Sequence, residues 1–171
     1  MENVFVEENG VYSIDCTKAL WATDSIHRTY QNAGLHLNDV DFVIEEQQDL
    51  FLVEYKNANI SAAANPQAFR PESDSKVNTV IRKFFDSLHY LALLNKNKPK
   101  SFIYVLEYPG GDSVTRRRLR NRLKTELPFL LQEMMGSGVH MIERLDVLSI
   151  DEWNAHKVYG KYPFAPVMGE E

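Results

Sequence analysis

The chain has 171 residues, 44% of them hydrophobic and 25% charged, which fits one globular domain with a sizeable core. Its formal net charge of −5 gives no general attraction for nucleic acid, so any basic surface must be local. The single cysteine, Cys16, excludes an internal disulfide and suits a reducing cytoplasm, where we expect the protein to act. No apolar run approaches the roughly 20 residues of a membrane span, and the acidic N-terminus lacks the pattern of a signal peptide.

The first expected elements are a β-hairpin and a helix. Apolar residues flank Asn9-Gly10 within residues 4–14, which is a strong signal for a tight hairpin turn. The apolar spacing of residues 17–33 predicts a helix, and Gly34 suits the left-handed position that follows a helix end.

Residues 41–56 predict a second hairpin, around which the rest of the chain is organised. Two short apolar runs flank the four polar residues 46–49, which suit a solvent-facing loop. A symmetric hairpin closed there pairs positions whose numbers sum to 95, so Asp41 lies opposite Glu54. Because side chains on one face of a strand recur every second residue, Lys56 shares a face with Glu54.

Two carboxylates that face each other across this hairpin need a compensating charge. Directly opposed residues have Cβ atoms about 5 Å apart, where like charges are unfavourable. A divalent cation together with Lys56 would offset the repulsion between Asp41 and Glu54. Glu45 falls on the same face as Asp41 by alternation and is a further candidate ligand, whereas Asp39 lacks the pairing with Glu54.

A long irregular segment and a crossover follow the hairpin. Residues 57–74 contain two prolines and many small or polar residues, and such loops are often functional. This segment either folds over the acidic cluster or is a plain surface connection. Residues 75–95 predict an amphipathic helix and 101–107 a strand, which together indicate a right-handed crossover parallel to strand 50–56.

The next expected helix is one-sidedly basic. It begins at Asp112 or Ser113, runs to about residue 127, and carries six arginines and lysines before its first acid, Glu126. A solvated helix face normally mixes both signs of charge, so this composition favours an anionic partner. The flanks of the helix present the residues that we expect to contact nucleic acid: Arg117, Arg118, Arg122 and Lys124.

The last part of the chain predicts short elements. Pro128 should interrupt the basic helix before a further helical turn. Residues 139–142 and 147–150 suit short strands, and Ser149 begins a capping box for a short helix. Residues 159–171 are expected to be an irregular tail. The five histidines show no metal-ligand spacing, so neither a zinc site nor a histidine-based triad is supported.

Asp41, twelve intervening residues and then Glu54-Tyr55-Lys56 resemble the active-site signature of the PD-(D/E)xK nuclease superfamily, which has the restriction-endonuclease-like fold. The order of helix, acid-bearing hairpin, long helix and strand over about residues 15–107 is also similar. The resemblance implies an α/β protein, a three-layer α/β/α sandwich with a central mixed sheet.

The whole of residues 1–171 is then one nuclease-like domain. Its core, at about 15–107, is followed by the basic helix at about 113–127 and by the C-terminal strands and tail at 139–171. Two departures from the pattern stand out: Val40 lies where the motif often has proline, and the predicted first helix carries no glutamate.

The resemblance also implies a metal centre. In that superfamily the aspartate and glutamate hold a divalent metal, usually magnesium, and the lysine positions or activates the attacking water. Carried onto this chain, Asp41 and Glu54 would bind Mg²⁺ or Mn²⁺, with the backbone carbonyl of Tyr55 beside the metal. Lys56 would serve the nucleophile. These residue types suit magnesium, which prefers oxygen ligands, few carboxylates and several waters.

The implied function is metal-dependent hydrolysis of phosphodiester bonds in nucleic acid, with DNA expected first, although the residues do not distinguish DNA from RNA. Two alternatives stay open. One is a nucleic-acid-binding module that keeps this fold without cleaving and uses the basic helix. The other is a protein-interaction domain whose acidic face contacts a basic partner. No membrane partner is expected, and the sequence leaves a homodimer open.

Overall fold

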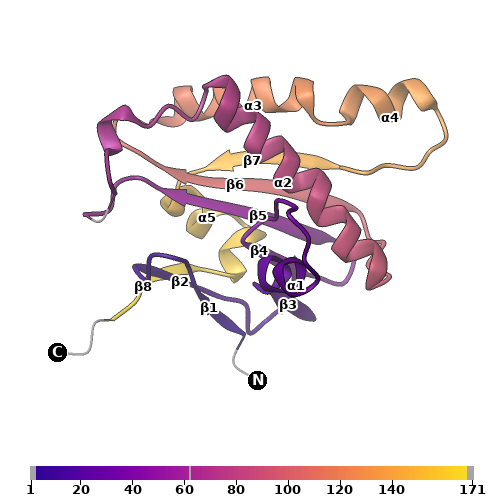
Figure 1. Cartoon of the computed structure of the whole chain (residues 1–171), viewed down its shortest axis with the longest axis horizontal. Helices are drawn as coiled ribbons and strands as arrows, with labels where there is room; N and C mark the ends of the chain where they lie inside the picture. Colours follow the sequence, from indigo (N-terminus) through magenta and orange to yellow (C-terminus); the bar gives the residue numbers. More distant parts are fainter. Residues whose placement is uncertain (1–2, 62, 169–171) are drawn as a thin grey trace.

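The computed structural model describes residues 3–61 and 63–168, and its centre is a five-stranded mixed sheet (Figure 1). The strand order is β3-β4-β5-β6-β7, in which β3, β4 and β5 are antiparallel neighbours and β5, β6 and β7 are parallel. The chain is therefore a mixed α/β protein, as expected. The five strands are β3 (Trp21–Thr23), β4 (Phe42–Glu45), β5 (Leu50–Asn57), β6 (Lys100–Glu107) and β7 (Arg144–Leu148).

The central hairpin has the register that the sequence predicts. Phe42 pairs with Val53 and Ile44 with Phe51, so the numbers of paired residues sum to 95. β4 is buried along its whole length, and β5 is buried except at Lys56. Because a slip of one residue would turn every apolar side chain to the wrong face, this burial fixes the register.

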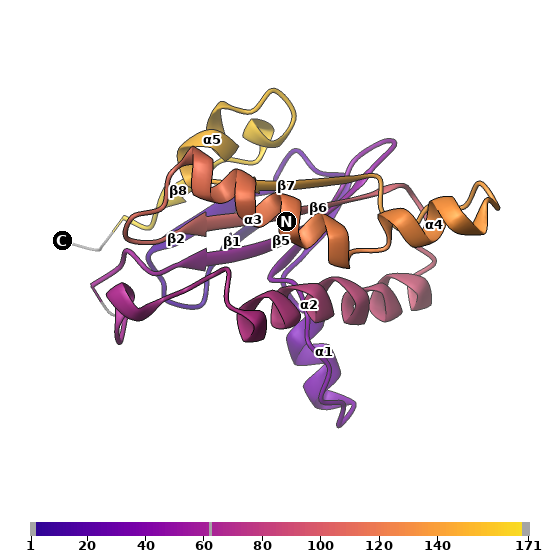
Figure 2. The ribbon, with the colours of Figure 1, turned by 90° about the horizontal axis from the view of Figure 1, so that it is seen from above.

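Helices and a small sheet cover the two faces of the central sheet. On one face lie α2 (Asp74–Leu93), α3 (Ser113–Glu126) and α4 (Phe129–Met135), which Figure 2 shows running roughly along the direction of the strands. On the other face lies α5 (Ile150–Ala155) with the small sheet. Each face has its own apolar core, so β5 sends Leu52 to the α2 side and Val53 to the α5 side.

The predicted crossover is confirmed. α2 begins one residue before the predicted range and connects β5 to β6, which pair in parallel from Leu50↔Lys100 to Asn57↔Glu107. Within its apolar stripe, Val77, Phe84 and Leu91 are fully buried against the sheet. The burial of this stripe holds the rest of α2 at a fixed distance above β5.

The helix predicted over residues 17–33 is wrong in its first half. Residues Trp21–Thr23 form β3, which pairs with β4, and only Ile26–Asn32 form a helix, α1. Hydrogen bonding to the edge of β4 explains the difference, because tertiary pairing overrides a weak helical pattern. Gly34 follows α1 with a φ of +71°, as its position predicts.

The small sheet brings both ends of the chain together in the order β1-β2-β8, with β1 at Val4–Val6 and β2 at Tyr12–Asp15. The predicted turn at Asn9-Gly10 is confirmed, with Gly10 at a φ of +71°. The expected irregular tail is wrong over the described residues: Tyr159–Lys161 form a 3₁₀ turn, η2, and Phe164–Pro166 form β8. Residues 169–171 of that tail lie outside the described residues.

The expected strand at 139–142 does not form. The side chain of Gln132 instead accepts hydrogen bonds from the backbone N–H groups of Met141 and Ile142 and donates to the Ile142 carbonyl. These backbone groups therefore need no neighbouring strand. The predicted break at Pro128 and the capping box at Ser149 are both present.

Within the described ranges, no helix combines the length and the apolar character that crossing a bilayer requires.

Candidate functional site

The two carboxylates of the predicted site lie at one end of the central hairpin. Asp41 immediately precedes β4, and Glu54 lies in β5 at the position that continues the register to Asp41. The Oδ2 atom of Asp41 accepts a hydrogen bond of 2.7 Å from the backbone N–H of Tyr55. This bond ties the Asp41 carboxylate to the strand that carries Glu54.

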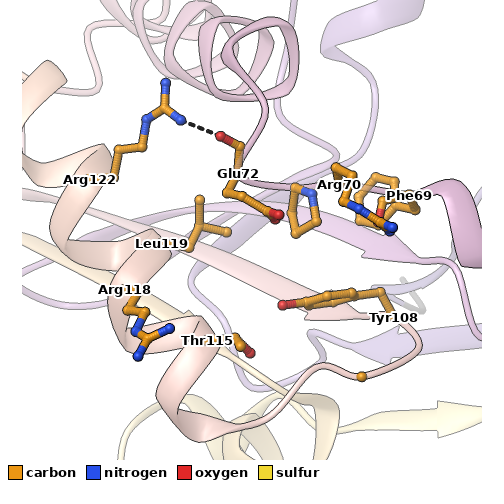
Figure 3. A pocket seen from close by; sticks show the side chains of 10 residues that line it. Phe69, Arg70, Glu72, Tyr108, Thr115, Arg118, Leu119 and Arg122 are labelled. Carbon is orange, nitrogen blue, oxygen red and sulfur yellow. Dashed lines mark hydrogen bonds between the residues drawn. The ribbon is translucent and has the colours of Figure 1, made fainter.

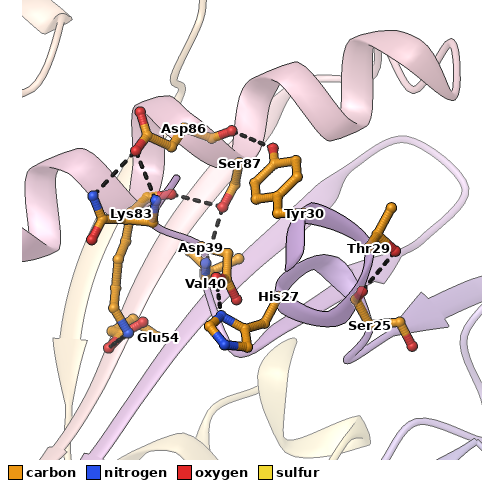
Figure 4. A network of polar contacts seen from close by, with 11 residues as sticks. Ser25, His27, Thr29, Tyr30, Asp39, Val40, Glu54, Lys83, Asp86 and Ser87 are labelled. Atoms are coloured by element: carbon orange, nitrogen blue, oxygen red, sulfur yellow. Dashed lines mark hydrogen bonds and ion pairs between the residues drawn. The ribbon is translucent and has the colours of Figure 1, made fainter. Parts of the chain in front are cut away.

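Helix α2 fixes the chain just before Asp41 (Figure 4). The Asp86 carboxylate accepts a hydrogen bond of 2.9 Å from the backbone N–H of Asn38, and the Ser87 hydroxyl accepts one of 3.0 Å from that of Val40. Ser87 in turn donates to the carbonyl of Lys83. The segment that leads to Asp41 is therefore held by side chains of α2, and Asp41 has little freedom to move.

Glu54 is almost completely buried, and one of its carboxylate oxygens has no hydrogen-bond partner in the part of the chain that the structure describes. Its exposed fraction is 5%, and its Oε1 atom accepts a hydrogen bond of 2.7 Å from the ammonium of Lys83 on α2. Its Oε2 atom is buried and has no hydrogen-bond partner among the described residues. A buried carboxylate oxygen without a partner is costly, so this atom calls for an explanation.

The pKa values of Asp41, Glu54 and Lys83 reflect the burial of these groups and the charges of their neighbours. Burial, and then the neighbouring Asp41 charge, raise the pKa of Glu54 well above its usual range, although Lys83 acts in the opposite direction. Burial also raises the pKa of Asp41, against the effects of Lys83 and of the Tyr55 N–H. Burial alone would lower the pKa of Lys83, but Glu54 and Asp41 more than offset it and raise that pKa. One ammonium thus faces two carboxylates.

A pocket of about 470 Å³ opens beside this cluster. Asp41, Lys56 and Lys83 line it, together with Asp39 and His27. Lys56 is exposed, on the face of β5 that also carries Glu54. The pocket therefore joins the Asp41 carboxylate and two ammonium groups to the solvent, from which a charged ligand can enter.

The structure places Asp41, Glu54, Tyr55 and Lys56 together at this end of β5. Sequence reasoning missed Lys83, which lies 29 residues beyond Glu54 along the chain. A signal was present: Lys83 and Ser87 follow Val80 at helical spacing, so both polar residues interrupt the apolar stripe of α2. Polar residues within a buried stripe need partners, and both of these have them here.

A histidine–aspartate pair at the pocket rim was also missed. The Nδ1 atom of His27, on α1, lies 2.9 Å from Asp39 Oδ1. His27 is exposed and lies twelve positions before Asp39 in the chain, a spacing that matches no motif. Nothing in the local sequence pointed to this pair, because the bend between α1 and β4 creates it.

Two other expectations about the site are corrected. Glu45, considered as an extra ligand, lies at the opposite end of β4 and forms ion pairs with Lys96 and Lys98. The segment 57–74 does not cover the acidic cluster, since Asn57 is its only described residue that lines the pocket.

The predicted basic residues of α3 differ in their surroundings. Arg117, Arg118 and Lys124 are exposed, and the ammonium of Lys124 lies 5.4 Å from the centre of the Phe129 ring. Arg122 is bound to the Asp74 carboxylate and to the carbonyl of Glu72. The guanidinium of Arg122 therefore ties α3 to the start of α2 and has less freedom to contact a phosphate.

Two carboxylates, those of Asp41 and Glu54, are the candidate ligands for a divalent cation. The residues that the structure describes contain no group of three or more His, Cys, Asp or Glu arranged for a metal. Magnesium needs only one or two carboxylates, because it retains several waters. Asp41 and Glu54 provide that number, and the unpaired Oε2 of Glu54 is an oxygen of the kind that the ion prefers.

Comparisons of the chain with protein-family models, with curated proteins and with solved structures found no match.

Proposed function

We propose that this protein is a Mg²⁺- or Mn²⁺-dependent nuclease of the PD-(D/E)xK type, with Asp41 and Glu54 as the metal ligands. The observation that carries the proposal is the buried Oε2 atom of Glu54, which has no partner among the described residues and belongs to a carboxylate opposite Asp41. The carboxylates of Glu54, which is buried, and of Asp41, which is half-buried, lie near one ammonium of α2, that of Lys83, and a divalent cation would offset the remaining repulsion between them.

The arrangement of the elements also supports the proposal. A restriction-endonuclease-like core is a three-layer α/β/α sandwich, and here helices lie on both faces of a mixed sheet whose central hairpin carries the acids. In the proposed fold the whole chain is a single domain. The crossover helix α2 closes the site from above, because it carries Lys83 and holds the segment before Asp41.

In the proposed reaction, each residue has a distinct role. The bound metal would supply a more acidic water and neutralise charge on the scissile phosphate. Glu54 and Asp41 would hold that ion, and the Tyr55 carbonyl would lie beside it. Lys56, at the solvent-facing mouth of the pocket, would place its ammonium against the phosphate or the attacking water. Lys83 would keep Glu54 ionised and oriented.

The decisive experiment is a crystal soaked with Mn²⁺, beside cleavage assays with plasmid, single-stranded DNA and RNA. We expect anomalous density between Asp41 and Glu54, and cleavage that a chelator abolishes. The melting temperature should rise in millimolar Mg²⁺ or Mn²⁺, since a ligand that binds only the folded state stabilises it. Absence of both density and a melting response would overturn the metal site, and binding without cleavage would favour a non-catalytic nucleic-acid-binding module.

The two lysines can be separated by substitution. Lys56→Ala should reduce turnover by about 100-fold, the usual effect of a group that assists proton transfer, with little change in metal affinity. Lys83→Ala should instead change metal affinity, because it removes the only described partner of Glu54. Lys18→Ala, at an exposed position outside the pocket, is the control. Equal turnover in Lys56→Ala and wild type would remove Lys56 from the mechanism.

A further inference from the structure

A second pocket, of about 420 Å³, lies between α3 and the segment that precedes α2 (Figure 3). Its walls combine two aromatic rings with several arginines and one acid. The residues that line it are Phe69, Arg70, Pro71, Glu72, Tyr108, Gly110, Thr115, Arg118, Leu119 and Arg122. Flat aromatic surface and positive charge together are complementary to a nucleotide, because the base is planar and the phosphate is anionic.

The aromatic part of this pocket is built around Tyr108. Its ring is half-buried and lies edge-to-face with Phe69, with ring centres 5.9 Å apart and an angle of 70° between the planes. Gly111 lies against the same ring, since a Cβ atom at that position would come within 2.7 Å of it. The absence of a side chain at Gly111 therefore allows the Tyr108 ring to pack against the turn, and a larger residue at position 111 would displace the ring.

The cationic part depends mainly on Arg118. Arg122 is already bound to Asp74 and to the Glu72 carbonyl, and Arg70 donates to the carbonyls of Gln67 and Phe69. Arg118 is exposed, and within residues 3–61 and 63–168 it has no ion-pair or hydrogen-bond partner. Its guanidinium thus keeps all its donors for a ligand in this pocket.

The pocket adjoins the acidic site on the same face of the sheet. Lys56 pairs with Leu106 on the neighbouring strand β6, and Tyr108 follows two residues later. One strand spacing across and two residues along place the Cα atoms of Lys56 and Tyr108 on the order of 8 Å apart. A nucleic-acid strand whose phosphate lies at the acidic site can therefore reach this pocket with a nearby base.

We infer that this pocket binds an unstacked base of a single-stranded nucleic acid against Tyr108, with Arg118 on an adjacent phosphate. A duplex keeps its bases stacked and paired, so it cannot insert one without the cost of unstacking it. The inference deepens the proposed function and rests on it for the identity of the strand as substrate. Binding itself needs neither the metal nor cleavage.

The test is binding of a fluorescently labelled ten-nucleotide single strand and of a blunt-ended duplex of the same length to the full chain in chelator, followed by fluorescence anisotropy. We expect tighter binding of the single strand. Tyr108→Leu should weaken that binding roughly tenfold or more, the usual effect of losing a stacking aromatic residue. Tyr108→Phe, which keeps the ring, should stay within about twofold of wild type.

Arg118→Ala should weaken binding and reduce the slope of log affinity against log salt by about one. Two controls lie outside the pocket: Tyr12→Leu, a similarly half-buried tyrosine, and Arg82→Ala, an exposed arginine of α2. If Tyr108→Leu fails to fold, Gly111→Ala displaces the same ring without removing it and should give the same loss.

Three results would overturn the inference: equal affinity for the single strand and the blunt-ended duplex, unchanged affinity in folded Tyr108→Leu, or an equal loss in the Tyr12→Leu control. Failure of the proposed function looks different. Binding that depends on Tyr108 but without any metal-dependent cleavage would leave this pocket standing and remove the nuclease. Metal-dependent cleavage, with a binding affinity that does not change in Tyr108→Leu, would support the nuclease and remove the proposed base-binding pocket.

Discussion

Two glutamates of the same hairpin, Glu45 and Glu54, share burial but differ in their partners. Both lie on the α2 side of the sheet, with exposed fractions of 8% and 5%. Glu45 forms ion pairs through both of its oxygens, with Lys96 and Lys98, whereas Glu54 has one oxygen on Lys83 and the other without a described partner.

The pKa values of the two carboxyls move in opposite directions. Burial alone would raise the pKa of Glu45, but the hydrogen bonds from Lys96 and Lys98 more than offset it and lower that pKa. At Glu54, burial and the Asp41 charge prevail over Lys83 and raise the pKa. A low exposed fraction therefore does not fix the direction of a glutamate's pKa shift; the balance of neighbouring charge does.

The largest expected effect is on cleavage. Asp41→Asn and Glu54→Gln should each reduce metal-dependent cleavage by about two orders of magnitude or more, because each removes a negative oxygen from a site that must hold a doubly charged ion. Glu45→Gln, the matched change at the structural glutamate, should retain cleavage within about twofold. Initial rates on a nucleic-acid substrate at saturating Mg²⁺ measure the difference. Comparable activity in Glu54→Gln and Glu45→Gln would break the comparison.

The next largest effect is on the free energy of unfolding in chelator. Here Glu45→Gln, which should keep cleavage, should be the less stable of the two glutamine variants. Glu45→Gln should lose about 1–3 kcal/mol, a value between those for exposed and buried ion pairs, because it leaves two ammoniums without their carboxylate. Glu54→Gln should be as stable as wild type or more so, since Lys83 keeps Asp41 nearby and the like-charge pair disappears.

Urea denaturation of both variants at neutral pH gives these values. The same Glu54→Gln protein should lose the rise in melting temperature that Mg²⁺ gives to wild type. A loss of stability in Glu54→Gln as large as that in Glu45→Gln would mean that the Lys83 pair is structural.

The smallest effect is the pH dependence of stability without metal. The pKa of Glu54 is raised in the folded state, so between its ordinary pKa and the raised value the folded chain binds more protons than the unfolded chain. Stability from this group therefore increases as pH falls through the raised pKa and is lost as pH rises through it. The stability of wild type relative to Glu54→Gln should thus increase on acidification.

The lowered pKa of Glu45 predicts the opposite trend. Its contribution is present above the ordinary glutamate pKa and lost as pH falls through the lowered value. Unfolding free energies of wild type and the two glutamine variants, measured in chelator from pH 8 down to about pH 2, below the ordinary glutamate pKa, show both trends. Parallel curves for the two variants would contradict the assignment.

The sequence alone was sufficient for those parts of the fold and of the site that depend on local pattern. The register of the hairpin follows from its apolar runs, and the long helix α2 follows from its stripe. The same pattern brought Asp41, Glu54 and Lys56 to one end of β5. These predictions needed only the periodicities of strand and helix.

The parts of the fold and of the site that the sequence did not predict depend on contacts between distant segments of the chain. β3 forms because residues 21–23 meet the edge of β4, and β8 forms because Phe164 is buried among aromatic residues from other elements. The ammonium of Lys83 can contact Glu54 only after α2 has packed on β5. No window of sequence contains both partners, so neither contact has a local signal.

The crossover that delivers Lys83 has a consequence for the order of folding. The β4–β5 hairpin joins residues close in sequence, whereas the β5–β6 pairing must first close a loop of about 50 residues, as Leu50↔Lys100 shows. Asp41 and Glu54 should therefore become neighbours in the folding transition state before the ammonium of Lys83 reaches them. We expect this unpaired repulsion to slow folding, so Glu54→Gln should refold faster than wild type in stopped-flow experiments, and Mg²⁺ should leave that advantage unchanged if the ion binds only after α2 has docked.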